Sequence, residues 1–71
     1  MSVVVPPSFL GYAARGAAWA AWLDRLPALL AGLIDEWGLG VDGPPVHGYA
    51  AIVVPVRTDA GEPVALKVGW P

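Results

Sequence analysis

The stretch AIVVPVRTDAGEPVALKVGW, residues 51–70, contains two runs rich in valine on either side of a short polar segment. Runs of this kind are typical of strands. The intervening residues 59–61 fit a three-residue hairpin loop, in which a type I turn is followed by Gly61 in the left-handed bulge position. The stretch therefore predicts an antiparallel hairpin in which Thr58 pairs with Glu62.

Lys67 is the only lysine of the chain, and it lies inside the second strand of this hairpin. Because side chains alternate across a strand, Ala65, Lys67 and Gly69 share one face, and the apolar residues between them form the other. The predicted register places Val53 opposite Lys67. A flat apolar group can then lie on Val53 and Ala65 while the ammonium group meets a negative charge. An edge-strand lysine that opposes aggregation is the alternative explanation.

Upstream of the hairpin, apolar residues recur at steps of three and four, which predicts one face of a helix. These residues are Trp19, Leu23, Leu26, Leu30, Leu33 and Trp37. Pro27 interrupts the pattern, and a proline inside a helix costs about 3 kcal/mol. We therefore expect two helical pieces that meet at Leu26 and Pro27, or one kinked helix. Gly38 is a candidate left-handed C-cap, with Leu39 folding back onto the last turn.

The sequence predicts an α+β fold, in which a helix or kinked helix pair is followed by a small antiparallel sheet. Residues 46–48, with those just before them, can supply a short first strand, and Pro55 implies an edge or a bulge. Prolines and a glycine interrupt residues 1–12, which are expected to be extended or loosely ordered. We expect residues 13–71 to form the folded part.

The composition excludes several classes of function. Charged residues make up 14% of the chain, against roughly 25% in a typical soluble domain, which suggests a surface that another chain covers. The net charge of -2 and the scattered cations argue against nucleic-acid binding. No charge-free stretch provides the roughly 20 apolar residues of a membrane span, and no signal peptide is evident, so a cytoplasmic protein is expected. One histidine and no cysteine predict neither a metal site nor a disulfide.

Several motifs appear in the order found in one family of kinases. V-A-L-K at residues 64–67 differs by one conservative change from the V-A-I-K strand of protein kinases, whose lysine pairs with the α and β phosphates of ATP. The other motifs are W-L-x-x-L-P at 22–27, W-G-L at 37–39, D-G-P-P-x-H-G at 42–48, V-V-P-V-R-T at 53–58 and L-K-V-x-W-P at 66–71. With these motifs in this order, the chain resembles the start of the aminoglycoside/hydroxyurea antibiotic resistance kinases. These are the streptomycin 6-phosphotransferase-like members of the aminoglycoside phosphotransferase superfamily.

The resemblance implies part of the N-terminal lobe of a protein-kinase-like fold, in an enzyme that uses ATP and Mg²⁺ to phosphorylate a hydroxyl of an aminoglycoside. Carried over by position, the nucleotide-binding residues would be Lys67 on the phosphates, Gly48, Tyr49 and Ala50 in the loop over the nucleotide, and Val53 and Ala65 beside the adenine. This loop has one glycine where protein kinases have three, which leaves cradling of the phosphates by its backbone open.

The same resemblance assigns no catalytic residue and no metal ligand to this chain. Phosphoryl transfer needs an aspartate base and metal-binding Asp and Asn side chains, and in the superfamily these follow the strand lysine. All six acidic residues of this chain precede Lys67. We therefore expect a fragment that is inactive alone and binds no cofactor securely. We also expect the isolated chain to self-associate. The sequence does not distinguish between aminoglycosides, or between these and hydroxyurea.

Two alternatives belong to other classes of protein. The first is a small non-catalytic interaction module that uses its apolar surface to bind a partner chain. The second is a surface-active amphipathic helix over residues 13–37, which fits poorly because its polar face carries both signs of charge and few cations. His47 has no nucleophile near it in the sequence, so a loop or capping role is expected for it.

Overall fold

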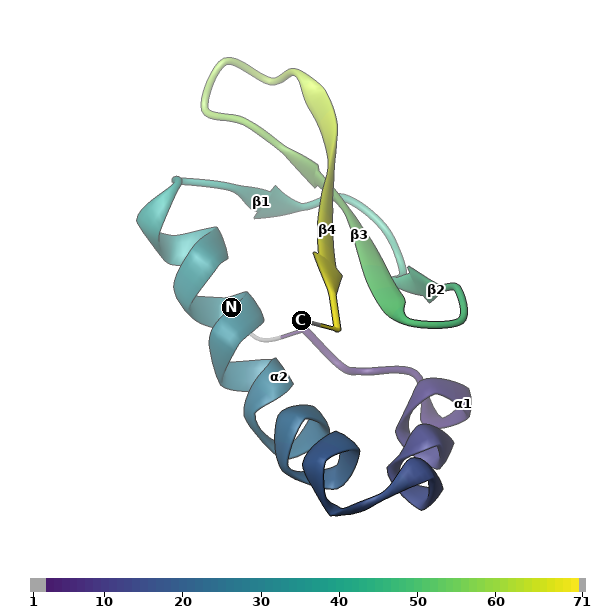
Figure 1. Ribbon diagram of the computed structural model, residues 1–71. Helices are drawn as coiled ribbons and strands as arrows, with labels where there is room; N and C mark the ends of the chain where they lie inside the picture. The colour runs from purple at the N-terminus through teal and green to yellow at the C-terminus, as the bar shows by residue number, and fades with distance from the viewer. Residues whose placement is uncertain (1–2, 71) are drawn as a thin grey trace.

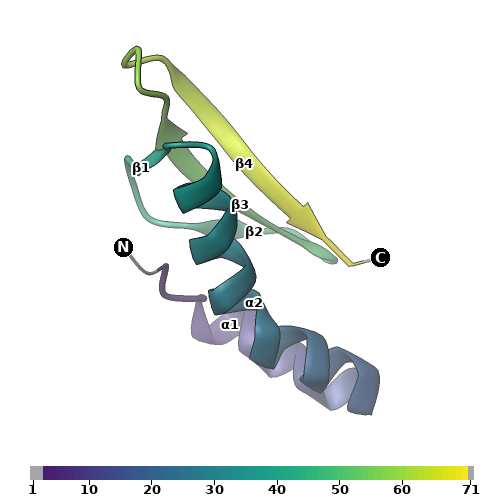
Figure 2. The ribbon, with the colours of Figure 1, turned by 90° about the vertical axis from the view of Figure 1, so that its left-hand side faces the viewer.

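The computed structural model describes residues 3–70 and has an α+β fold, in which helices precede an antiparallel sheet (Figure 1). The helical elements are α1 (Pro7–Leu10), a 3-10 turn η1 (Gly11–Arg15) and α2 (Ala17–Glu36). The strands are β1 (Gly40–Val41), β2 (Val46–His47), β3 (Ala51–Arg57) and β4 (Pro63–Gly69). Helix α2 runs along one face of the sheet, as the view from the side shows (Figure 2). The predicted fold class is confirmed.

Helix α2 continues through Pro27 without a break, so of the two forms expected, a pair of helical pieces or one helix, the structure has the single helix. The proline is exposed, while the neighbouring Leu26 and Leu30 are fully buried. Burying one leucine contributes about 1.5–3 kcal/mol, and an interior proline costs about 3 kcal/mol. The two leucines together therefore offset the proline. By length and composition alone α2 is also long enough to cross a membrane, a test that core helices pass too, and α2 packs five side chains into the core.

The C-terminus of α2 has the predicted glycine cap. Gly38 adopts a φ of 62°, and its N–H donates to the Asp35 carbonyl at 3.3 Å. The N–H of Leu39 donates to the Ile34 carbonyl at 2.9 Å. These two bonds form a Schellman motif, which satisfies carbonyls that the helix end leaves unpaired. Leu39 then packs against the core as expected.

The predicted apolar stripe of α2 is partly correct. Leu23, Leu26 and Leu30 are buried, but Trp37 is 57% exposed. Trp37 is the C-cap, with φ of -98° and ψ of 5°. Because the helical period ends before this residue, its side chain leaves the stripe. Trp22 and Ile34 are buried instead, at positions that the periodicity did not select.

Strand β3 is the centre of the sheet, with β4 paired along one edge and β1 and β2 sharing the other. Between β1 and β2, the N–H of Asp42 donates to the Pro55 carbonyl at 2.8 Å. The nitrogen of Pro55 faces the same edge and has no hydrogen to donate, so pairing is interrupted there. The predicted edge or bulge at Pro55 is wrong, because Pro55 lies in the central strand. Its missing N–H instead coincides with the gap between β1 and β2. The predicted first strand is β2, and β1 was not predicted.

The β3–β4 hairpin has the predicted register, with Val53 opposite Lys67. Gly61 has a φ of 82°, and its N–H donates to the Thr58 carbonyl at 2.9 Å. The N–H of Thr58 in turn donates to the Glu62 carbonyl at 3.0 Å. These contacts confirm the three-residue loop with glycine in the left-handed position.

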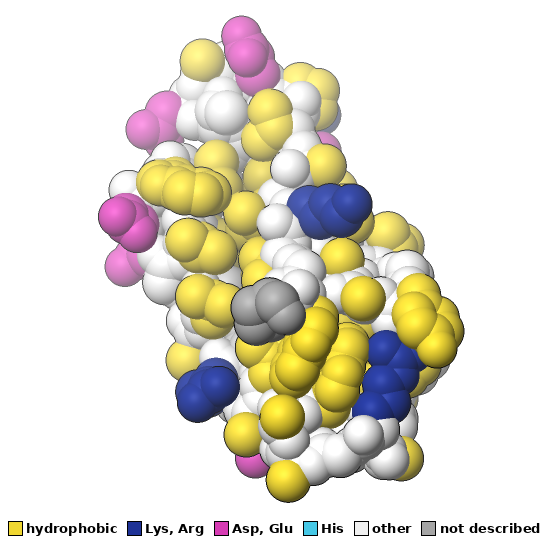
Figure 3. Space-filling view, viewed as in Figure 1, with side chains coloured by type: hydrophobic (Ala, Val, Ile, Leu, Met, Phe, Trp, Pro, Cys, Tyr) yellow, Lys and Arg dark blue, Asp and Glu magenta, His cyan; other side chains and the backbone are white. Residues whose placement is uncertain are grey.

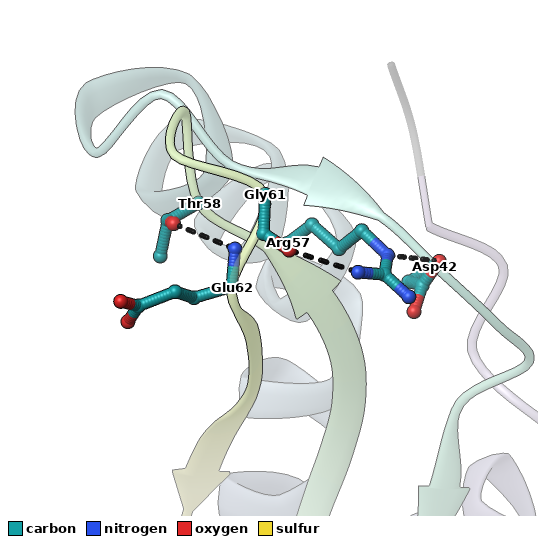
Figure 4. A network of polar contacts seen from close by, with 5 residues as sticks. All are labelled: Asp42, Arg57, Thr58, Gly61 and Glu62. Carbon is teal, nitrogen blue, oxygen red and sulfur yellow. Dashed lines mark hydrogen bonds and ion pairs between the residues drawn. The ribbon is translucent and has the colours of Figure 1, made fainter.

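Arg57 ties the hairpin loop to the connection between β1 and β2 (Figure 4). Its Nη1 donates to the Gly61 carbonyl at 2.8 Å, and its Nε donates to the Asp42 carboxylate at 3.0 Å. Both side chains of this ion pair are partly exposed, so its contribution to stability is small. Its main effect is to fix the position of the loop.

The N-terminal segment differs from the extended or loosely ordered stretch that the sequence predicted. Pro7 occupies the first turn of α1, a position where the fixed φ of proline suits a helix. The prolines therefore start a helical turn instead of preventing one. Phe9 of that turn is fully buried, and Val3 and Val5 are also in the core. The division of the chain at residue 12 stays a prediction, and residues 1, 2 and 71 lie outside the described residues.

Candidate functional site

The two faces of the β3–β4 hairpin differ in burial. On the inner face, which packs against α2, Ile52, Val54 and Val56 are buried. The outer face carries the alternate residues, and these are half-buried or exposed. The outer-face residues are Ala51, Val53, Pro55, Arg57, Pro63, Ala65, Lys67 and Gly69. A ligand can therefore reach the side chains of the outer face, whereas those of the inner face are covered.

The outer face contains an open pocket of about 380 Å³ at the end of the sheet away from the hairpin loop. Its floor consists of two cross-strand pairs, Ala51 with Gly69 and Val53 with Lys67. Ala51 has only a methyl group and Gly69 has no side chain, which leaves the space that makes the surface concave. The lining residues are Gly48, Tyr49, Ala50, Ala51, Val53, Lys67, Gly69 and Trp70.

The structure brings five of the six predicted nucleotide-binding residues to this pocket. They are Lys67, Val53, Gly48, Tyr49 and Ala50. Ala65 pairs with Pro55 on the same outer face but does not line the pocket, because it lies two residues further toward the hairpin loop. Contact of any of these residues with a nucleotide stays a prediction.

Sequence reasoning missed Ala51, Gly69 and Trp70 as lining residues. The predicted register already pairs Ala51 with Gly69, so extending it along the hairpin was enough to find them. The same register places Trp70 opposite Ala50, and a backbone hydrogen bond joins these two residues. The ring of Trp70 also stacks on Trp19 of α2 at a centroid distance of 4.4 Å, a contact that local pattern does not reveal.

Lys67 is the only charged residue among those that line the pocket. Its side chain is exposed, and within residues 3–70 the ion pair that forms is between Arg57 and Asp42. Figure 3 shows basic side chains set among hydrophobic ones, while most acidic side chains lie at the top and left of this face. The pocket thus combines apolar walls with one ammonium group that no described carboxylate neutralises, which suits an anionic ligand with a flat apolar part.

The turn between β2 and β3, residues 48–50, forms one wall of the pocket, and we call it the pocket loop. The N–H of Gly48 donates to the Ala51 carbonyl at 2.9 Å. The N–H of Trp70 donates to the Ala50 carbonyl at 2.8 Å, which ties the loop to the end of β4. The loop is therefore closed by backbone bonds on both sides.

His47 anchors the pocket loop and does not face a candidate substrate group. Its Nδ1 lies 2.9 Å from the Gly48 carbonyl, and its Nε2 lies 2.6 Å from Ser8 Oγ. A carbonyl only accepts, so Nδ1 must carry the hydrogen and donate to it. In that tautomer Nε2 accepts a hydrogen bond from the Ser8 hydroxyl. This arrangement fits the expected loop role. Within residues 3–70, no group of three His, Asp or Glu side chains is placed to hold a metal ion.

Known proteins resemble this chain over most of its length. It is 42% identical over 53 residues to a hydroxyurea phosphotransferase from Kitasatospora aureofaciens. It is 40% identical over 58 residues to a streptomycin 6-kinase from Streptomyces glaucescens, and 43% identical over 56 residues to one from Streptomyces griseus. The alignments cover 75%, 82% and 79% of this chain, respectively.

The same alignments cover only 16%, 19% and 18% of the three relatives, so the chain spans less than a fifth of their length. No protein-family model matches the sequence, and no solved structure matches it significantly.

Proposed function

We propose, from the premise that this chain is homologous to streptomycin 6-kinases and a hydroxyurea phosphotransferase, that its outer-face pocket binds ATP. The proposal makes the chain part of the nucleotide-binding lobe of an antibiotic kinase. The observation that carries it is the position of Lys67, the single charged group of a pocket whose other walls are apolar or backbone. An ammonium group in that setting offsets phosphate charge, as the strand lysine of kinases does.

The positions of the charged and apolar residues on the outer face suggest how the nucleotide is oriented along the strands. Lys67 and the pocket loop lie at the end of the sheet, so the phosphates belong there. Val53, Pro55 and Ala65 continue the outer face toward the hairpin loop and carry no charge. The adenine then lies on this apolar strip, with Ala65 beyond the pocket itself. The proposal thus assigns to the six predicted residues the roles that the resemblance implies.

The proposed reaction transfers the γ-phosphoryl group of ATP to a hydroxyl of an aminoglycoside. The bond between the γ-phosphorus and the bridging oxygen breaks, and a new bond to the acceptor oxygen forms while its proton leaves. Mg²⁺ would neutralise the charge that develops on the β and γ phosphates. Residues 3–70 gather no carboxylates for that metal, so the proposal assigns to this chain only the binding of the nucleotide.

The proposal places the protein in the cytoplasm, where ATP is available. It leaves the acceptor at the level of the class, because the pocket contains no group that selects one aminoglycoside over another. The relatives carry the names of streptomycin and hydroxyurea, and both acceptors are therefore the first to test.

A second candidate function is a non-catalytic interaction module. The observation in its favour is apolar exposure: Trp37 is 57% exposed, Val46 59% and Tyr49 79%. The outer edge of β4 also has no strand beside it within the described residues. A module of this kind needs no ligand for Lys67, so a nucleotide titration separates the two functions.

The test is the affinity of the 71-residue chain for ATP, measured by calorimetry. Lys67→Met keeps the length and the apolar stem of the side chain but removes the charge. Arg25→Met removes one charge from an exposed site on α2 that does not line the pocket, and serves as the matched control. We expect weak but saturable binding, which Lys67→Met abolishes and Arg25→Met leaves intact. Equal behaviour of the two variants, or no binding by the unaltered chain, would refute the proposal.

A further inference from the structure

Arg15 contacts the pocket loop from outside the sheet. Its Nη1 donates to the Tyr49 carbonyl at 3.1 Å. The guanidinium carbon lies 4.0 Å from the centre of the Tyr49 ring and 4.0 Å from that of Tyr12. It also lies 4.7 Å from the ring of Trp19. One side chain from η1 thus holds both the backbone and the side chain of Tyr49.

These contacts have the geometry of cation–π interactions. A guanidinium group within about 6 Å of a ring centre is attracted by the negative face of the ring, and the planar group can donate a hydrogen bond at the same time. Tyr49 is 79% exposed. Without Arg15, the side chain of Tyr49 would keep its tilted contact with Tyr12, at a centroid distance of 6.1 Å, and little else to hold it.

The pocket loop needs such support because its own sequence provides little. Glycine-rich loops let several backbone N–H groups approach a phosphate. Here the loop has a single glycine, Gly48, and the N–H of that residue is already bonded to the Ala51 carbonyl at 2.9 Å. A loop that cannot wrap around the phosphates must instead be held in place beforehand, since ordering it on binding would cost affinity.

We propose that Arg15 is a positioning residue of the pocket, which holds residues 48–50 in the binding conformation through Tyr49. This inference rests on the proposed function, because it names the residue that keeps one wall of the ATP pocket in place. Arg15 acts through Tyr49 and does not line the pocket itself. Arg15 is the last residue of η1, so the inference also gives this N-terminal segment a part in the site. None of the nucleotide-binding motifs includes a residue of η1.

The experiment compares Arg15→Lys and Arg15→Met in the 71-residue chain. Lysine keeps the charge but lacks the planar group that packs on the rings, and methionine removes both. Arg25→Lys and Arg25→Met are the matched controls on the exposed surface of α2. Three quantities are measured for each variant: hydrogen exchange of the pocket-loop amides without ligand, the Kd for ATP, and the Tm.

We expect faster exchange in the pocket loop and an ATP Kd raised about threefold to tenfold in both Arg15 variants, the scale of one or two lost cation–π contacts. The Tm should fall by only a few degrees, because cation–π contacts at exposed sites contribute little to stability. The control variants should match the unaltered chain in all three quantities. A purely structural role for Arg15 would lower the Tm without selective loosening of the loop, and that result would overturn the inference.

The remaining outcomes separate the inference from the function on which it rests. If the unaltered chain binds ATP and both Arg15 variants bind it equally well with an equally ordered loop, the inference about Arg15 fails alone. If the unaltered chain does not bind ATP, the proposed function fails, and the inference fails with it.

Discussion

The inner and outer faces of the β3–β4 hairpin are made by the same two strands, yet they differ in burial and in charge. Ile52, Val54 and Val56 of the inner face are at most 1% exposed and pack against the helices. The residues of the outer face are half-buried or exposed, and they include Arg57 and the only lysine of the chain. Because successive residues of a strand point to opposite faces, neighbouring residues of β3 contribute separately to stability and to the pocket.

Loss of the Lys67 charge is expected to have the largest effect. In a longer protein that contains this chain and phosphorylates an aminoglycoside, Lys67→Met should lower kcat/KM by about a hundredfold or more, the scale of losing one preorganised group that stabilises transition-state charge. A thermal melt must show that the variant is folded. Turnover equal to that of the unaltered protein would remove the nucleotide assignment from the outer face.

The adjacent residues Val53 and Val54 provide the sharpest comparison of the two faces. Val54 is fully buried, so Val54→Ala should lower the free energy of unfolding by about 2 kcal/mol, through lost burial and a residual cavity. Val53 is only half-buried, so Val53→Ala should cost less than about 1 kcal/mol. Urea denaturation measures both changes.

The same pair of variants should show the opposite order in nucleotide binding. Val53→Ala removes part of the pocket floor and should weaken ATP binding, whereas Val54→Ala should leave the affinity of the folded fraction unchanged. If the two variants were equally destabilised and equally impaired in binding, the two faces would not be separate.

The cost of a substitution at Gly61 in the hairpin loop should depend only on the backbone conformation of that residue. A Cβ built on Gly61 meets no atom within 4 Å, so only its φ of 82° opposes a side chain. Gly61→Val should therefore destabilise by more than about 1 kcal/mol, the strain of a left-handed β-branched residue. Gly61→Asn is the matched control, because asparagine tolerates this region and should cost less. Superimposable melts of the valine variant and the unaltered chain would show that the loop conformation is different.

Self-association is the smallest and most condition-dependent effect that we expect. The exposed side chains of Trp37, Val46 and Tyr49, together with the unpaired edge of β4 in the described part of the chain, favour contacts between molecules. Few charges oppose such contacts, since the net charge is -2. Light scattering of the 71-residue chain over a range of concentrations should show growing particles near neutral pH. A monodisperse monomer at every concentration would instead favour an isolated, self-sufficient domain.

The sequence predicts local structure well where one or two residues determine the backbone. The hairpin register follows from the loop at residues 59–61, and the end of α2 follows from Gly38. The predicted register also brought Lys67 opposite Val53, which located most of the pocket. In these regions the determining contacts are close in the sequence.

The parts that sequence reasoning missed depend on contacts between distant segments. Phe9 is buried because it packs against Trp22 and His47, and the prolines before it gave the opposite signal. Arg15 reaches Tyr49 across 34 positions, and Trp70 stacks on Trp19 from the other end of the chain. No period or motif encodes such contacts, so the packing of Arg15 on Tyr49 and of Trp70 on Trp19 becomes visible only in three dimensions.

The most direct test of the central claim is to map ATP binding residue by residue, by NMR titration of the 71-residue chain below the concentration at which it associates. We expect shift changes to concentrate on residues 48–51, on Val53 and on residues 65–70, and to vanish in Lys67→Met. The amides of α2 and of the hairpin loop should change little. No saturable shifts, or shifts that concentrate on α2 and persist without the lysine, would contradict the assignment of the outer face as a nucleotide site.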